Sequence, residues 1–189
     1  MGWFRRSPGA EPLPVTMAGV RLGDRFLAVG MRDPALIAAL AVKAGLTGRA
    51  CAYDADADRA RNGATAVERE GALVEAVHAP WGMLPYDADS FDVAVARDVL
   101  MILPPEVRAR CLSEVFRVLR PGGRLVVIEP APRGGFGALL TRTTVDADYV
   151  ERGGAVTALT RAGFSGARVL ATRDGTVYVE GAKRAISGI

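Results

Sequence analysis

Residues 104–130, PPEVRARCLSEVFRVLRPGGRLVVIEP, hold a helix and a strand separated by a turn. The helix follows a proline pair and carries apolar residues at helical spacing: Val107, Cys111, Val115 and Leu119. Pro121-Gly122-Gly123 ends the helix, and Arg124–Glu129 follows as a strand. The middle of this strand is entirely apolar, as in a parallel strand that helices cover on both faces.

Strands and helices alternate on either side of this stretch. The other expected strands are 25–30, 49–53, 73–78 and 91–96, and the other expected helices are 34–44, 56–70 and 154–162. Two last strands, 167–172 and 176–181, are separated only by Arg173-Asp174-Gly175, which predicts a tight hairpin. The pattern predicts a doubly wound, mostly parallel α/β sheet with an antiparallel hairpin at its end.

The length of 189 residues is that of one domain. Residues 1–14 contain three prolines, and we expect a flexible leader there, in which Trp3 and Phe4 either pack on the domain or touch a membrane surface. Residues 15–189 form the expected single domain. The segment between residues 130 and 153 is short, so any lid over a substrate is expected to be thin.

Composition narrows the classes of partner. Twenty-four basic against 21 acidic residues give a net charge of +3, too balanced to indicate nucleic acid. Two distant cysteines and one histidine exclude a Cys/His zinc site, so we expect no metal. No apolar run approaches the ~20 residues of a membrane span, and we expect a cytoplasmic protein without stable membrane insertion. A small-molecule substrate is expected, and a homodimer or a partner protein stays open.

Ligands of an open parallel sheet bind at the carboxyl ends of its strands. Five loops are therefore candidates, those after Gly30, Asp54, His78, Ala96 and Glu129. Asp54 follows Gly30 by 24 residues, near the ~20 typical of an acid that binds ribose hydroxyls. The same residue can instead cap the helix that begins near residue 56, and both roles are compatible.

Several stretches resemble one family: FLAVG at 26–30, CAYDAD at 51–56, LPYDADSFDVAVARDVL at 84–100 and FRVLRPGGRLVVIEP at 116–130. With GGAVTALTRAGF at 153–164 and the final hairpin, residues 17–184 resemble class I S-adenosylmethionine-dependent methyltransferases of the small-molecule and ubiquinone-biosynthesis type. The resemblance implies a seven-stranded, Rossmann-like sheet in the order 3-2-1-4-5-7-6. It also implies S-adenosylmethionine as the cofactor.

The resemblance assigns residues to the cofactor: Gly30, Met31, Arg32, Asp54, Ala55, Pro80, Trp81 and Arg97. Asp98 and Glu129 are the substrate-side candidates. No catalytic base is assigned, because a sulfonium leaving group drives methyl transfer and the protein supplies alignment and desolvation. We expect His78, on a strand, to be structural.

The glycine motif of the family is degenerate in this chain. Ala28 replaces the acid that the family places before its Gly-x-Gly-x-Gly turn, and Arg32 and Pro34 replace the second and third glycines. Pro80 replaces the aspartate that contacts adenine, although Trp81 can stack on a flat ring. Side chains obstruct the close backbone approach that glycine allows, whereas Arg32 can pair with the cofactor carboxylate.

Three functions remain in view. The first is a methyltransferase for a small molecule, with weak cofactor binding and a dissociation constant above about 100 μM. The alternative is a methyltransferase-like protein with lost or weakened cofactor binding that serves as a partner or regulatory subunit. A nucleotide-dependent oxidoreductase is the third, and the missing Gly-x-Gly-x-x-Gly motif argues against it.

Overall fold

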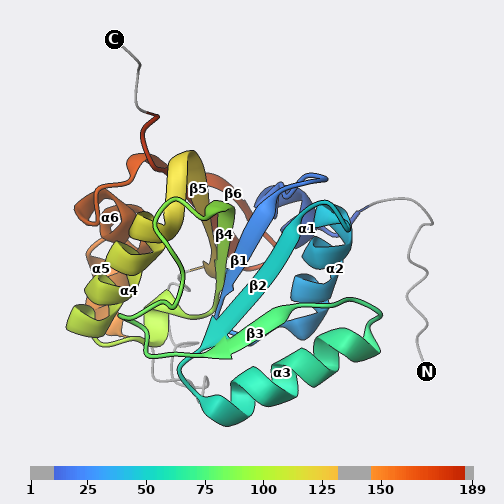
Figure 1. Cartoon of the computed structure of the whole chain (residues 1–189). Helices are drawn as coiled ribbons and strands as arrows, with labels where there is room; N and C mark the ends of the chain where they lie inside the picture. The colour runs from blue at the N-terminus through green and yellow to red at the C-terminus, as the bar shows by residue number, and fades with distance from the viewer. Residues whose placement is uncertain (1–10, 132–145, 186–189) are drawn as a thin grey trace, which may run out of the picture.

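In the part of the chain that the structure describes, seven strands form one sheet in the order β3-β2-β1-β4-β5-β7-β6 (Figure 1). The computed structural model describes residues 11–131 and 146–185. β7 pairs antiparallel with both of its neighbours in the sheet, β5 and β6. The strands are β1 (Arg25–Val29), β2 (Arg49–Asp54), β3 (Glu75–His78), β4 (Phe91–Arg97), β5 (Leu119–Pro130), β6 (Ser165–Arg173) and β7 (Thr176–Ala182). The predicted doubly wound sheet and its order are confirmed.

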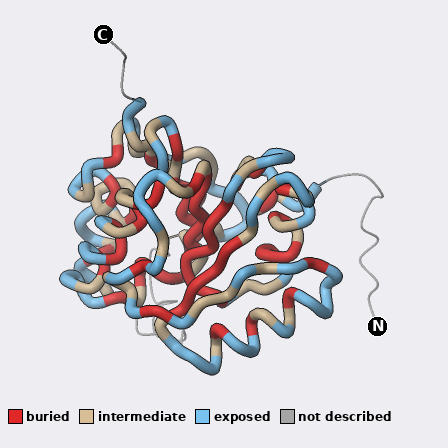
Figure 2. The backbone as a smooth tube through the Cα atoms, in the orientation of Figure 1, coloured by how far each residue is buried: buried red, intermediate tan, exposed pale blue. Residues whose placement is uncertain are grey.

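Helices cover both faces of the sheet (Figure 1). One face packs against α1 (Leu13–Ala18), α2 (Pro34–Ala44) and α3 (Ala57–Arg69). The other face packs against the 3-10 turn η1 (Leu100–Ile102), α4 (Pro105–Val118), α5 (Ala147–Glu151) and α6 (Gly154–Arg161). Figure 2 shows the central strands as the buried centre of the molecule, with exposed residues along the outer faces of the helices.

Local sequence explains where the elements near the site begin. Asp33 caps α2, because its Oδ1 accepts a hydrogen bond from the Leu36 N–H at 3.0 Å, and Pro34 occupies the first helical position. Between β6 and β7, Asp174 and Gly175 have φ of 50° and 72°. Two successive positive φ values are those of a type I′ turn, which matches the twist of a hairpin.

Some boundaries differ from the predictions. α4 ends at Val118 and β5 begins at Leu119, so the Pro-Gly-Gly stretch belongs to β5 and not to the end of the helix. Leu119 pairs with Phe91 before a register shift, and this early pairing ends the helix. β3 begins at Glu75 instead of Leu73. α1 begins at Leu13, inside the expected leader, and residues 1–10 lie outside the described residues.

The described residues provide no helix long and apolar enough to cross a bilayer. Within the same residues, no cluster of three or more His, Cys, Asp or Glu side chains is arranged to hold a metal ion. Cys51 and Cys111 are free thiols buried in the core. Most of the segment expected to form a thin lid, residues 132–145, lies outside the description.

Candidate cofactor site at the carboxyl edge of the sheet

The chain reverses its direction of travel across the sheet between β1 and β4. β1 pairs with β2 on one side and with β4 on the other. Open α/β sheets bind ligands in the crevice outside the strands at such a switch point. The residues after β1 and β4, Gly30 and Asp98, therefore mark the centre of the candidate site.

Asp54, at the end of β2, is completely buried and accepts three hydrogen bonds. Its Oδ2 accepts from the Met31 N–H at 3.0 Å and from Arg59 Nε at 2.9 Å. Its Oδ1 accepts from the Asp56 N–H at 3.0 Å. Asp54 thus fixes the turn after β1 and the entry to α3. The capping of α3 itself falls to Asp56, which accepts from the N–H groups of Asp58 and Arg59.

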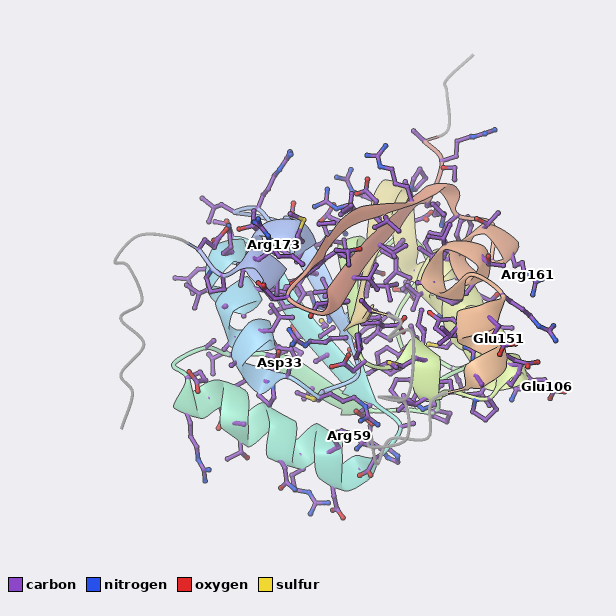
Figure 3. The ribbon with its side chains drawn as sticks, turned by 180° about the vertical axis from the view of Figure 1, so that it is seen from behind. Asp33, Arg59, Glu106, Glu151, Arg161 and Arg173 are labelled. Atoms are coloured by element: carbon purple, nitrogen blue, oxygen red, sulfur yellow. The ribbon has the colours of Figure 1, made fainter. Side chains whose placement is uncertain are left out.

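Arg59 was not predicted as a site residue. It lies in the first turn of α3, and Figure 3 shows it at the edge of the sheet that also holds Asp33. Its side chain is 36% exposed while that of Asp54 is 0% exposed, so the guanidinium covers the carboxylate from the solvent side. The sequence holds one signal for this contact: Arg59 is a basic residue in the first helical turn of the segment that follows Asp54.

Gly30 lies beneath two side chains. Its φ of +83° favours glycine, and a Cβ there would lie 2.5 Å from Val99 Cγ2, 3.5 Å from Trp81 Cη2 and 3.8 Å from Asp54 Oδ2. The Trp81 ring meets Tyr53 edge-on, with ring centroids 5.4 Å apart. The flat indole of Trp81, from the loop after β3, therefore lies beside the turn after β1 and near the buried carboxylate.

The other cofactor candidates are dispersed around this centre. The Met31 side chain is buried and packs against Gly63 of α3, so only its backbone faces Asp54. Pro80 is exposed. His78 Nε2 lies 3.3 Å from the carbonyl oxygen of Ala55, which fits the structural role expected for this histidine.

Arg97, the last residue of β4, forms ion pairs at the same edge with Asp33 and with Asp98, which follows the strand. Arg97 Nη1 lies 3.0 Å from Asp33 Oδ2, and Arg97 Nε lies 3.6 Å from Asp98 Oδ2. Arg32 is exposed in the turn after Gly30. The structure therefore brings Arg32, Arg97 and Asp98 near Gly30, in addition to Asp33.

Glu129, the second substrate-side candidate, is turned into the protein. Its Oε2 accepts a hydrogen bond from the Tyr149 hydroxyl at 2.9 Å, and its Oε1 accepts from the Met101 N–H at 3.1 Å. Burial raises the pKa of this carboxyl to about 7, against the opposing effect of these hydrogen bonds and of Arg108. These two hydrogen bonds connect β5, which carries Glu129, with η1 and α5. Because Glu129 is only 4% exposed, it does not line an open surface.

Arg108 of α4 supports the same connection. It donates from Nε to the Leu100 carbonyl at 2.8 Å and from Nη2 to the Leu103 carbonyl and Asp146 Oδ2, both at 2.6 Å. Its guanidinium carbon lies 4.2 Å from the centre of the Tyr149 ring. Neither Arg108 nor Tyr149 has a sequence signal, because the contacts of Arg108 with Asp146 and of Tyr149 with Glu129 join segments far apart in the chain.

The residues at this edge fit S-adenosylmethionine in part. The positive φ of Gly30, the flat indole of Trp81 and the neighbouring charges of both signs suit a nucleoside that carries an amino acid. A ribose hydroxyl reaches Asp54 only if Arg59 moves, since Arg59 covers that carboxylate. The types of side chain at this edge fit the cofactor, whereas the ion pair between Arg59 and Asp54 opposes tight binding.

The comparisons with known proteins agree with this architecture. The family described as "Methyltransferase domain" matches residues 27–127. A demethylmenaquinone methyltransferase from Clavibacter sepedonicus is 44% identical over 57 residues, 30% of this chain and 22% of the relative. An uncharacterized protein from Haemophilus influenzae is 40% identical over 43 residues, 23% of this chain and 17% of the relative. The matched stretches thus span about a fifth of these curated relatives.

Solved structures share the fold across most of the chain. A SAM-dependent methyltransferase from Aquifex aeolicus superposes with a TM-score of 0.72 at 19% identity, covering 89% of this chain and 87% of its own. One from Methanosarcina mazei gives a TM-score of 0.67 at 20% identity, covering 94% and 100%. With the family match over more than half of its length, the chain belongs to the methyltransferase-domain family and has the fold of class I S-adenosylmethionine-dependent methyltransferases.

Proposed function

We propose that this protein transfers a methyl group from S-adenosylmethionine to a small molecule. One observation carries the proposal: Gly30, Trp81 and the Asp54 carboxylate meet at the switch point of the sheet, where the nucleoside of a cofactor binds. The name of the Clavibacter relative, a demethylmenaquinone methyltransferase, supports a small-molecule acceptor.

In this proposal the residues of the chain bind, orient and exclude water. S-adenosylmethionine supplies a methyl group on a positively charged sulfur, which needs no general base for activation. The Gly30 turn allows close backbone approach, Trp81 stacks on the adenine, and Asp54 accepts from the ribose once Arg59 is displaced. Glu129 acts through Met101 and Tyr149, holding the loops on the acceptor side in place.

Titration calorimetry with S-adenosylmethionine and S-adenosylhomocysteine tests the proposal. We expect binding with a dissociation constant above about 100 μM, a binding free energy of less than roughly 5.5 kcal/mol, because Arg59 must leave Asp54 and the Pro80 side chain cannot accept a hydrogen bond from adenine. Transfer of a labelled methyl group to candidate acceptors then identifies the substrate. Absence of any binding at millimolar ligand would overturn the proposal.

A second function is favoured by the covered carboxylate. The three N–H donors on Asp54 are what a chain that has given up the cofactor would retain for folding. In that case the protein serves as a partner subunit of another protein. One of the structures with this fold is a complex of a methyltransferase with an activator from Haloferax volcanii, with a TM-score of 0.61 at 16% identity. Failure of the calorimetric test would select this function.

A further inference from the structure

A cleft of about 90 Å³ lies between α4, α5 and α6 and shares no lining residue with the candidate cofactor site. We call it the helix cleft. Each of the three helices contributes an arginine to its lining: Arg108 from α4, Arg152 from the C-terminal cap of α5, and Arg161 from α6. Figure 3 labels Arg161 and also Glu106 and Glu151 on the other two helices, and neither glutamate belongs to the described lining. Three guanidinium groups therefore border one hollow.

The sequence of α6 explains why a hollow remains there. Gly154, Thr157, Ala158 and Arg161 are three or four positions apart, so they share one face of the helix, and all four line the cleft. The first three residues are small, which leaves space beside α4 and α5. Side chains of a helix lean toward its N-terminus, so Arg161 extends back along this face. α6 thus supplies a void, a hydroxyl donor and a cation.

Arg108 forms a rigid, buried part of the wall. Its side chain is 9% exposed, and its three hydrogen bonds use Nε and Nη2, which leaves Nη1 for a ligand. Because these bonds and the Tyr149 ring already hold the guanidinium, a ligand binds it without ordering a flexible side chain. Tyr149 also lines the cleft and donates to Glu129 at the end of β5, so a ligand here adjoins a contact of the sheet.

The described lining carries an excess of positive charge. Arg108 pairs with Asp146 at 2.6 Å, and Arg152 pairs with Asp148 at 2.8 Å. Two aspartates thus face three arginines, and Arg161 is the cation that these two pairs leave over. An anion in the cleft would balance this charge.

We propose that the helix cleft binds a phosphate group, held by Arg161, Arg108 and the Thr157 hydroxyl. Phosphate carries about −1.5 to −2 charges at pH 7, and its oxygens accept hydrogen bonds from guanidinium and hydroxyl donors. A volume of about 90 Å³ suits a group of this size, whereas pockets for whole small molecules begin at about 300 Å³. The group belongs either to free phosphate or to a larger molecule whose remainder stays outside the cleft.

NMR titration of the full-length protein with inorganic phosphate tests this site, with sodium chloride of equal ionic strength as the reference. We expect saturable shifts of the Gly154 and Thr157 backbone amides, with a dissociation constant on the order of 1 mM. Arg161→Gln should weaken phosphate binding about fivefold, and Thr157→Val about twofold. Arg173→Gln removes the same charge at the end of β6 and should leave the affinity unchanged (Figure 3).

Asp148→Asn tests the charge balance in the opposite direction. It removes an acid from the lining whose side chain is 66% exposed, and it should tighten phosphate binding about twofold. Asp58→Asn makes the same change of net charge on α3, at a side chain that is 81% exposed, and should have no effect. Equal effects of these two variants would show that phosphate responds only to the net charge of the protein, and the site would be rejected.

Phenyl phosphate distinguishes the two sources of the group. Tighter binding of phenyl phosphate than of inorganic phosphate would identify a larger molecule, and equal or weaker binding would identify free phosphate; both results support the site. The inference is overturned if phosphate gives no saturable shift beyond that of chloride, or if Arg161→Gln binds phosphate as the unmodified protein does. Binding of S-adenosylmethionine is measured separately, so the proposed function stands or falls independently of this site.

Discussion

Arg59 Nε lies 2.9 Å from Asp54 Oδ2, and this ion pair covers the acid that would bind a ribose. The carboxylate is therefore engaged within the protein before any ligand arrives. Arg59 also reaches Asp56 Oδ2 at 3.2 Å, so displacing it costs a second contact. Ribose recognition in this chain must compete with an internal cation.

Replacing Arg59 by glutamine should increase affinity for S-adenosylhomocysteine about threefold or more. The variant removes the charge that competes for Asp54 and frees an acceptor position for a ribose hydroxyl. The stability cost should be about 1–3 kcal/mol, because the variant removes the cation beside a carboxylate that is 0% exposed. Calorimetry measures the affinity, with Arg61→Gln as control. Weaker binding would mean that Arg59 itself contacts the ligand.

Asp54→Ala should lower the free energy of unfolding by about 3 kcal/mol, since it leaves the buried Met31 N–H and the part-buried Asp56 N–H without an acceptor. Urea titration provides the measurement. Where the variant remains folded, S-adenosylmethionine affinity should fall by roughly 1.5–3 kcal/mol.

The control for Asp54 is Asp58→Ala, at an acid in the first turn of α3 whose side chain is 81% exposed. Its stability change should stay within about 0.5 kcal/mol. Unchanged ligand affinity in folded Asp54→Ala would exclude a ribose role for that residue.

Glu129 should make the protein less stable as the pH rises from about 4.5 to about 7. Its pKa is raised by burial from 4.5 to about 7, so in this window the folded state holds a proton that the unfolded state has lost. The loss should be on the order of 3 kcal/mol, complete above pH 7. Glu129→Gln should lack this slope in unfolding experiments between pH 4.5 and 8.

Glu106, labelled on α4 in Figure 3, provides the comparison for Glu129. Glu106→Gln removes an exposed carboxylate and should follow the pH dependence of the unmodified protein. Parallel curves for Glu129→Gln and the unmodified protein would show that the Glu129 carboxyl titrates normally.

Arg108→Met should destabilise the protein by about 3 kcal/mol. It leaves the carbonyl groups of Leu100 and Leu103 without their donor and removes the cation from the Tyr149 ring. Thermal and urea unfolding measure the effect. Arg152→Met, at an exposed pair within α5 and its C-terminal end, should cost less than about 0.5 kcal/mol. Comparable losses for the two variants would contradict the role of Arg108 as a connector.

The sheet could be predicted because its strands are apolar and its helices begin at local signals. Asp33-Pro34 fixes the start of α2, and Asp174-Gly175 fixes the final turn, both within a few residues. α1, η1 and α5 are three to six residues long and leave no periodicity to recognise. The end of α4 was misplaced because a strand pairing, that of Leu119 with Phe91, decides it.

From the sequence, the candidate site could be predicted only as the loops at the carboxyl ends of the strands. Topology alone places Gly30, Asp54 and Asp98 at one edge. The orientation of a side chain depends on contacts across the sheet, and so Glu129 is turned inward toward Tyr149 although its position suggested a substrate contact. Arg59 covers Asp54 through a contact within one turn of α3, which spacing alone did not distinguish from a surface cation.

Because Asp54 holds the turn after β1 and the entry to α3, natural selection for folding alone is sufficient to preserve it. A descendant of this chain that lost methyl transfer would still be expected to keep the acid, since its removal leaves the buried Met31 N–H unsatisfied. After a loss of function, substitutions should appear first at Arg32, because this residue is exposed and contributes less to folding than Asp54 does. An acid aligned with Asp54 is therefore a mark of ancestry, and Arg32 is the position that reports continued use.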